Sequence, residues 1–193
     1  MNRWFLAAIQ FLNHIAQLEM KNLRYLALLL ILLGTSAQAQ TKKEKKEMKA
    51  QEEEKLFATT KELIESGTYE FYADWANSFQ GRRINLVTNP NHLKMNQEEA
   101  SVYLPYYGVA HNSSPAYSNM GAMEFKGTVE NYEVKVNEKK RQMIVTFRCR
   151  AKREVLDMSL TVFADGNSRL NSNSSVRTGV NYDGRTTAPA PEE

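Results

Sequence analysis

The sequence predicts an α+β fold that is mostly β, in which an antiparallel sheet curls into a sandwich or an open barrel and carries one N-terminal amphipathic helix. Two observations lead to this prediction. After residue 67, apolar and polar side chains alternate in one segment after another, which is typical of half-buried strands. These segments follow one another too closely for crossover helices, so we expect neighbouring strands to be antiparallel.

The predicted helix precedes the strands. Residues 40–55 are mostly Lys, Glu, Gln and Ala, which form helices readily but have little apolar surface to bury. We therefore expect a charged helical spacer there. The next residues place one apolar face at helical spacing: Leu56, Phe57, Thr60, Leu63 and Ile64. This face should dock on the sheet, and Gly67 should end the helix in a left-handed C-terminal cap.

Ten segments have the composition of strands. The clearest is 69–75, where Tyr69, Phe71, Ala73 and Trp75 alternate with more polar side chains. The others are residues 83–87, 92–95, 101–104, 122–126, 132–136, 143–150, 155–163, 168–173 and 180–186. The predicted breaks between segments include Asn89-Pro90-Asn91, Lys126-Gly127 and Asp165-Gly166. Residues 56–187 are thus predicted to form a single β-rich domain, followed by a disordered tail at 188–193.

Residues 20–39 have the pattern of a signal peptide. Lys21 and Arg24 precede an unbroken apolar run at 25–33, and Ala37-Gln38-Ala39 supplies the small residues that signal peptidase accepts. The apolar run is about half as long as a membrane-spanning helix requires. We therefore predict cleavage between Ala39 and Gln40, and a periplasmic or secreted protein with no permanent membrane anchor after cleavage.

Residues 1–19 lie upstream of this signal. They contain apolar side chains of their own and would make an overlong basic region for a signal peptide. One interpretation is a misplaced start, with translation beginning at Met20. The alternative is a genuine N-terminal extension.

Several motifs resemble a known family. They are the run NLVTNP at 85–90, Leu93, VYLPYYG at 102–108, Phe125, Asn131-Tyr132 and the polar segment 168–175. In these motifs the sequence resembles domain-of-unknown-function family 4251, exported proteins typical of Bacteroidetes-type bacteria, and LPYYG is the most specific part. The resemblance covers about residues 57–187 and implies a compact exported domain. The family carries no assigned activity, so the resemblance implies no catalytic or binding residue.

Charge and composition argue against several functions. The net charge is +3, of which Arg3, Lys21 and Arg24 against Glu19 supply +2, so the mature chain carries +1 and nucleic acid is not an expected partner. Cys149 is the single cysteine, so no intramolecular disulfide can form. The alternating pattern places this cysteine on the core face, where a thiol behaves as a small apolar group.

The candidate ligands and catalysts are few. His92 and His111 are the histidines that remain after cleavage, too few for a zinc site, and we expect no metal and no cofactor. No G-x-S-x-G motif is present. The carboxylates of Asp74, Glu124 and Asp157 could meet only through folding. The prediction is a non-enzymatic cell-envelope module that binds a ligand or partner. The alternative is a small periplasmic hydrolase whose carboxylates converge in three dimensions.

Two segments are candidate binding sites. Residues 105–121 are long for a β connection and carry Tyr106, Tyr107, His111 and Tyr117, side chains that suit a ligand site. The alternative is that Tyr106 and Tyr107 cap the end of the core. A basic hairpin at 135–153 could attract an anionic partner, such as a lipid head group or an acidic glycan, through Arg148, Arg150, Lys152 and Arg153. Its alternative role is a solvated sheet face, screened by the Glu-rich helix, that opposes aggregation.

The leader generates a direct test of export. Replacing Ala37 and Ala39 with bulky residues should block the signal peptidase and leave a retained precursor, because the enzyme accepts only small side chains at these positions. Immunoblots of cell fractions would measure the precursor. Normal maturation of the double variant would contradict the cleavage assignment.

Overall fold

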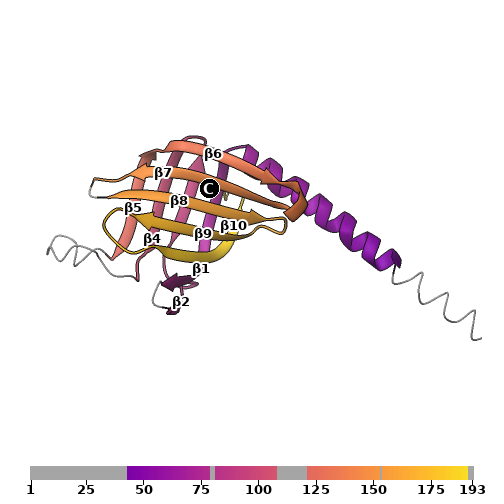
Figure 1. Ribbon diagram of the computed structural model, residues 1–193, viewed down its shortest axis with the longest axis horizontal. Coiled ribbons are helices and arrows are strands. Elements are labelled where there is room, and N and C mark those ends of the chain that lie inside the picture. Colours follow the sequence, from indigo (N-terminus) through magenta and orange to yellow (C-terminus); the bar gives the residue numbers. More distant parts are fainter. Residues whose placement is uncertain (1–42, 79–80, 108–120, 153, 191–193) are drawn as a thin grey trace, which may run out of the picture. The chain divides into compact units, whose positions relative to one another are not determined.

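The computed structural model describes residues 43–78, 81–107, 121–152 and 154–190 (Figure 1). In this part of the chain a helix at residues 43–65 is followed by ten strands. The strands are β1 (Thr68–Ser78), β2 (Arg83–Asn85), β3 (His92–Asn96), β4 (Glu99–Pro105), β5 (Ala122–Thr128), β6 (Glu130–Asn137), β7 (Gln142–Arg150), β8 (Val155–Phe163), β9 (Asn167–Ser174) and β10 (Val180–Thr187). A short 3-10 helix, η1 (Glu138–Lys140), joins β6 to β7. The predicted mostly β fold with one N-terminal helix is confirmed.

The strands form one sheet in the order β5-β4-β3-β1-β10-β9-β8-β7-β6, with β2 paired to β1 outside this path. Every pair of neighbours is antiparallel. Of the two predicted forms, the sheet takes that of a barrel, nearly closed on itself (Figure 1). Eight antiparallel steps, an even number, separate β5 from β6, so these two strands run in the same direction. Val129 alone lies between them, so β5 and β6 are two halves of one long strand that changes partner.

A bulge marks the point where the long strand changes partner. Asn131 has a positive φ of 55°, and the register of β6 on β7 shifts between Glu130 and Glu133. Just before the bulge, the Val129 N–H donates to the Glu98 carbonyl at 2.8 Å. The break predicted at Lys126-Gly127 is therefore wrong, because both residues lie inside β5 and pair with β4. The true discontinuity is a bulge a few residues later.

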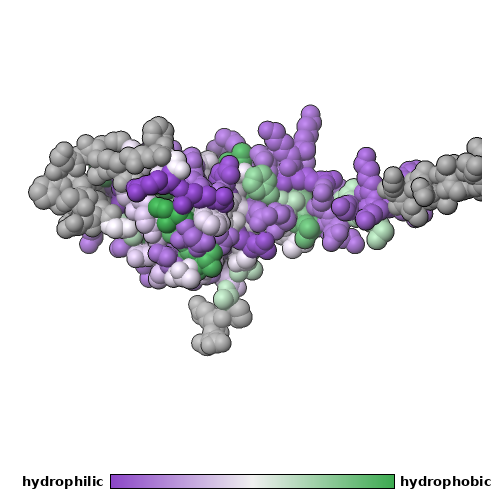
Figure 2. Space-filling model, turned by 90° about the horizontal axis from the view of Figure 1, so that it is seen from below, coloured by the Kyte–Doolittle hydropathy of each residue, from purple (hydrophilic) through white to green (hydrophobic). Residues whose placement is uncertain are grey.

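Apolar side chains fill the interior of the barrel. The largest buried groups come from many strands and include Tyr69, Phe71, Leu93, Met123, Met143, Leu156 and Tyr182. Cys149 lies among them, and burial raises the pKa of its thiol to about 12, so the thiol stays protonated at neutral pH. The prediction that Cys149 faces the core is confirmed. The outer face seen in Figure 2 is mostly hydrophilic, with apolar side chains in small separate patches.

Asn91 completes the pairing of β1 where that strand bulges. The register with β10 shifts between Ala73 and Trp75, which leaves Asp74 as an extra residue. On the other edge, β3 pairs with Phe71 and β2 with Trp75, so Ala73 lies between the two partners. The Asn91 Oδ1 accepts from the Ala73 N–H at 2.6 Å, and its Nδ2 donates to the Ala73 carbonyl at 3.0 Å. The amide side chain thus takes the place of one residue of a paired strand.

The last turns of the helix pack against the barrel. Phe57, Thr60 and Ile64 are buried. Leu56 was predicted to lie on the same docked face, but it is 44% exposed, so this part of the prediction is wrong. The Thr60 hydroxyl donates to the Ala164 carbonyl at 2.8 Å. The helix ends at residue 65, and Gly67 has the left-handed φ of 70° expected of its cap.

Ion pairs link this part of the helix to the turn between β6 and β7. Lys61 contacts Glu138 at 2.8 Å, and Arg141 contacts both Glu53 and Glu54. These pairs are solvent-exposed and so add little stability. No helix in the described ranges is long and apolar enough to cross a membrane.

Candidate functional site

A buried ion pair closes one end of the barrel. Arg177 lies in the connection from β9 to β10, and Glu154 lies in the turn from β7 to β8. Their side chains are 1% and 2% exposed. Arg177 donates to both carboxylate oxygens of Glu154, with 2.9 Å from Nε to Oε2, and the Ser174 hydroxyl donates to Oε2 at 2.6 Å. Such hydrogen bonds are needed because an unpaired charge in this position would be costly.

Arg177 also holds the start of β5. Its Nη2 donates to the Ala122 carbonyl at 3.0 Å, and its guanidinium lies over the Tyr106 ring, 4.6 Å from the ring centre. The Tyr106 hydroxyl donates in turn to the Thr178 carbonyl at 3.1 Å. One cation therefore fastens the β7–β8 turn, the β9–β10 connection and the beginning of β5 to one another.

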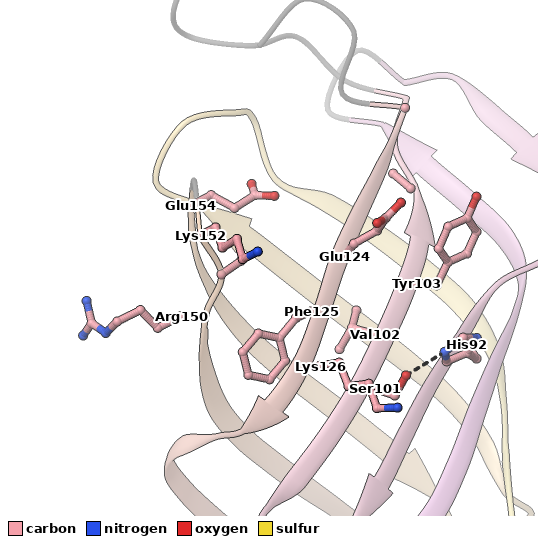
Figure 3. A pocket seen from close by; sticks show the side chains of 13 residues that line it. His92, Ser101, Val102, Tyr103, Glu124, Phe125, Lys126, Arg150, Lys152 and Glu154 are labelled. Carbon is pink, nitrogen blue, oxygen red and sulfur yellow. Dashed lines mark hydrogen bonds between the residues drawn. The ribbon is translucent and has the colours of Figure 1, made fainter. Parts of the chain in front are cut away.

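A hollow of about 660 Å³ lies above this pair, in the seam between β5 and the end of β7. On one side it is lined by side chains of β3, β4 and β5, and on the other by residues 150–152 and Glu154 (Figure 3). Phe125, half-buried, lies on the β5 side of the seam (Figure 3). The volume falls within the range of about 300–1,000 Å³ that is usual for ligand pockets.

The charged groups around the hollow differ in how far they are already paired. Arg150 donates to both carboxylate oxygens of Glu130, at 3.0 and 3.1 Å, and Glu154 is held by Arg177. Lys126 and Lys152 are exposed and have no ion-pair partner among the described residues. Glu124, also exposed, has none within the same part of the chain. The hollow thus offers two uncompensated ammonium groups and one carboxylate.

His92 forms a neutral polar wall of the hollow. Burial lowers the pKa of His92, and the nearby Lys94 acts in the same direction, whereas Glu70 opposes them. At neutral pH the ring is therefore uncharged. Its Nε2 lies 3.1 Å from the Ser101 hydroxyl, and the ring stacks on Tyr103 with 6.2 Å between centres. This side of the hollow can exchange hydrogen bonds without contributing charge.

The family described as "Domain of unknown function (DUF4251)" matches residues 51–186, well over half of the chain. The chain belongs to the DUF4251 family. Among solved structures, the crystal structure of a DUF4251 family protein from Bacteroides eggerthii DSM 20697, at 1.95 Å resolution, is similar with a TM-score of 0.54. It is 14% identical, and the match covers 69% of this chain and 87% of that one, so the likeness shows the fold alone. No curated protein matches.

The tyrosines of the predicted loop site lie at the end of the core of this DUF4251 domain. Tyr106 and Tyr107 are half-buried and pack against the core cluster. Besides the contacts of Tyr106 given above, the Tyr107 hydroxyl accepts from the Asn89 Nδ2 at 3.5 Å. His111 and Tyr117 lie outside the described residues. Neither tyrosine lines the hollow, although Tyr106 supports Arg177 below it.

The predicted basic patch divides at the seam. Arg148 and Arg150 lie on the same outer face of β7, as the alternation predicted, but Arg148 pairs with Asp157 at 2.7 Å and Arg150 pairs with Glu130. Lys152 lines the hollow. Arg153 lies outside the described residues. Sequence analysis did not single out Lys126 and Arg177, because a single cation in a polar segment carries no pattern of its own.

The three candidate carboxylates do not come together. Glu124 lines the hollow at the seam, whereas Asp74 lines a smaller hollow of about 270 Å³ beside Trp75 and Gly184. Asp157 forms an ion pair with Arg148. Within the described ranges, no cluster of three or more His, Cys, Asp or Glu side chains could hold a metal ion.

The buried pair predicts an asymmetry between single and double substitutions. Arg177→Met should lower the free energy of unfolding by about 3–5 kcal/mol, because Glu154 would remain as an uncompensated buried charge. Adding Glu154→Leu should restore much of this loss. Urea unfolding of the variants would measure both effects.

The matched control is Arg148→Met, which breaks the exposed pair with Asp157 and should cost about 0–1 kcal/mol. If Arg177→Met cost no more than Arg148→Met, the buried pair would not be what holds this end of the barrel.

Proposed function

We propose that the protein is an exported, non-enzymatic binding module of the cell envelope, periplasmic or secreted after removal of its leader. We further propose that it binds an anionic ligand in the hollow between β5 and the end of β7. Export is supported by the basic start, apolar run and Ala37-Gln38-Ala39 ending of residues 20–39. The maturation test of Ala37 and Ala39 addresses this part of the proposal.

The pairing of charges at the hollow is the observation that carries the binding proposal. Five charged side chains line the hollow, and two of them are already paired: Arg150 with Glu130, and Glu154 with Arg177. Lys126, Lys152 and Glu124 have no ion-pair partner among the described residues, so two ammonium groups against one carboxylate leave a net charge of +1. An excess of positive charge in a concave site concentrates anions there. The stacked rings of His92 and Tyr103 add a neutral wall able to contact the rest of a ligand.

The arrangement gives less support to a hydrolase that works through carboxylates. Both oxygens of Glu154 are engaged by Arg177, so this carboxylate is not free to contact a substrate. Asp74 and Asp157 lie away from the hollow.

Titration with small anions tests the proposal. Tripolyphosphate and a short oligo-uronic acid, followed by the NMR signals of the mature protein, should shift residues around the hollow. The double variant Lys126→Glu, Lys152→Glu should bind these anions about tenfold more weakly or worse, which corresponds to about 1.4 kcal/mol. Added salt should weaken binding to the unaltered protein, because the attraction is electrostatic.

Lys139→Glu with Lys140→Glu provides the control, because both are exposed lysines in η1, at the opposite end of β7, and the pair changes the net charge by the same amount. It should leave binding almost unchanged. Equal losses in the control and the double variant would mean that the anions respond to net charge alone, and the proposed site would be wrong.

A further inference from the structure

One edge of β5 faces the hollow and pairs with no other strand in the described part of the chain. Two hydrogen bonds define which residues of β5 face β4: the Tyr106 N–H donates to the Gly121 carbonyl, and the Val129 N–H donates to the Glu98 carbonyl. Backbone groups of an antiparallel strand alternate between its two edges. The backbone N–H and C=O groups of residues 121, 123, 125, 127 and 129 therefore face β4 and hydrogen-bond to it, whereas those of Glu124 and Lys126 point into the seam.

The ends of this free edge are already occupied. The Ala122 carbonyl, which also points into the seam, accepts from Arg177 at 3.0 Å. At the other end, the bulge after Val129 carries the chain onto β7. For Glu124 and Lys126 the structure shows no backbone partner on this edge in the residues it describes. The gap spans about three to four residues of extended chain.

On the opposite side of the seam, too, the described residues include backbone groups without a strand partner. The Ala151 N–H donates to the Glu154 carbonyl at 2.9 Å, so residue 151 faces β8 and Arg150 faces away from it. On that side, β6 pairs with β7 no further than Arg148, opposite Glu130. The N–H and C=O groups of Arg150 therefore also point into the seam. The hollow is lined by main-chain donors and acceptors on both sides.

We propose that this seam binds an extended acidic polypeptide segment, which adds as a short strand to the free edge of β5. The inference deepens the proposed function and rests on it, since it names the class of anion. In strand addition, main-chain hydrogen bonds supply affinity and the alternating side chains supply specificity. Glu124 and Lys126 offer the hydrogen bonds that an incoming strand requires.

The side chains around the edge favour a partner with an acidic residue beside Lys126 and apolar residues on the opposite face, while an uncharged polar residue such as Thr beside Glu124 avoids repulsion between carboxylates. Lys126 points outward from β5, so the residue beside it on an added strand would have its side chain within reach. Lys152 lies on the other side of the same opening. Phe125 points to the opposite face of β5 and is half-buried, so an apolar side chain beside it would complete its burial.

A second copy of the chain fits this opening less well. The edge strand β5 of another copy would bring its own β4 behind it. The hollow is bounded on its far side by residues 150–152, which lie where a sheet behind an added strand would have to pass. A single extended segment brings no second strand behind it, so it can lie between β5 and residues 150–152.

Peptides with defined main-chain chemistry provide the test. The probes are acetylated hexapeptide amides in which Val, Leu, Phe or Tyr alternates with Glu or Thr, together with versions N-methylated at alternate residues. The unmodified peptides should slow amide hydrogen exchange at Glu124 and Lys126. N-methylation should weaken their binding about tenfold or more, because it removes main-chain donors while keeping the charge. Lys126→Glu with Lys152→Glu should weaken binding similarly, with Lys139→Glu and Lys140→Glu together as the control of equal charge.

The outcomes separate this inference from the proposed function. If tripolyphosphate binds at the hollow and no peptide does, strand addition is wrong and the anion site stands. Peptide binding that ignores N-methylation and leaves exchange at Glu124 and Lys126 unchanged would also overturn strand addition. If exchange at these amides slows with protein concentration alone, the occupant is a second copy. If neither peptide nor tripolyphosphate binds, both proposals are wrong.

Discussion

The pairing of Arg177 with Glu154 is the interaction on which the geometry of the candidate site depends. Arg177 contacts a carboxylate from the β7–β8 turn and a carbonyl from β5, which are the two sides of the seam. Both charges are almost fully buried, so neither can leave the other without a large cost. The pair therefore sets the separation of the two sides at the base of the hollow, and it closes the barrel where no strand pairing does.

The seam itself follows from the long strand formed by β5 and β6. The first half of this strand, β5, pairs with β4, and the second half, β6, pairs with β7. The edge of β5 that faces away from β4 therefore lacks the neighbour that β6 has in β7. The barrel is closed near Val129, where the strand changes partner, and within the described residues no strand lies beside the edge of β5 that precedes Val129. Exposed edges invite association with other chains, and proteins commonly protect them with charged side chains. Here the charges at the edge, Lys126 and Lys152, can serve equally to select an acidic partner.

Local features of the sequence predicted much of the fold, because the causes of those features are local. The alternation of Tyr69, Phe71 and Ala73 predicts a strand wherever it ends up in the sheet, and the same reasoning placed Cys149 in the core. Gly67 was predicted to cap the helix because few other residues adopt its φ. The prediction of a break at Lys126-Gly127 failed because glycine occurs near bulges inside strands as well as in turns. Only the pairing with β4 shows which of the two applies here.

The site could not be predicted in the same way, because it depends on contacts between distant residues. Arg177 lies in a run of Ser, Asn and Thr that suggests an exposed turn, and nothing near it reveals Glu154 or Ala122 as partners. Arg148 and Arg150 formed a visible basic pattern, yet folding supplies each with a carboxylate. Lys126 and Lys152, by contrast, have no ion-pair partner among the described residues, and this too depends on the fold rather than on the local sequence.

The claim that β5 has a free edge facing the hollow is tested most directly by amide hydrogen exchange of the unliganded protein. Met123 and Phe125, which pair with β4, should exchange slowly, whereas Glu124 and Lys126 between them should exchange like exposed amides. This alternation along one strand is the result that the account predicts. Slow exchange at all four residues would show that β5 pairs on both edges, and the seam proposed as the binding site would then be closed.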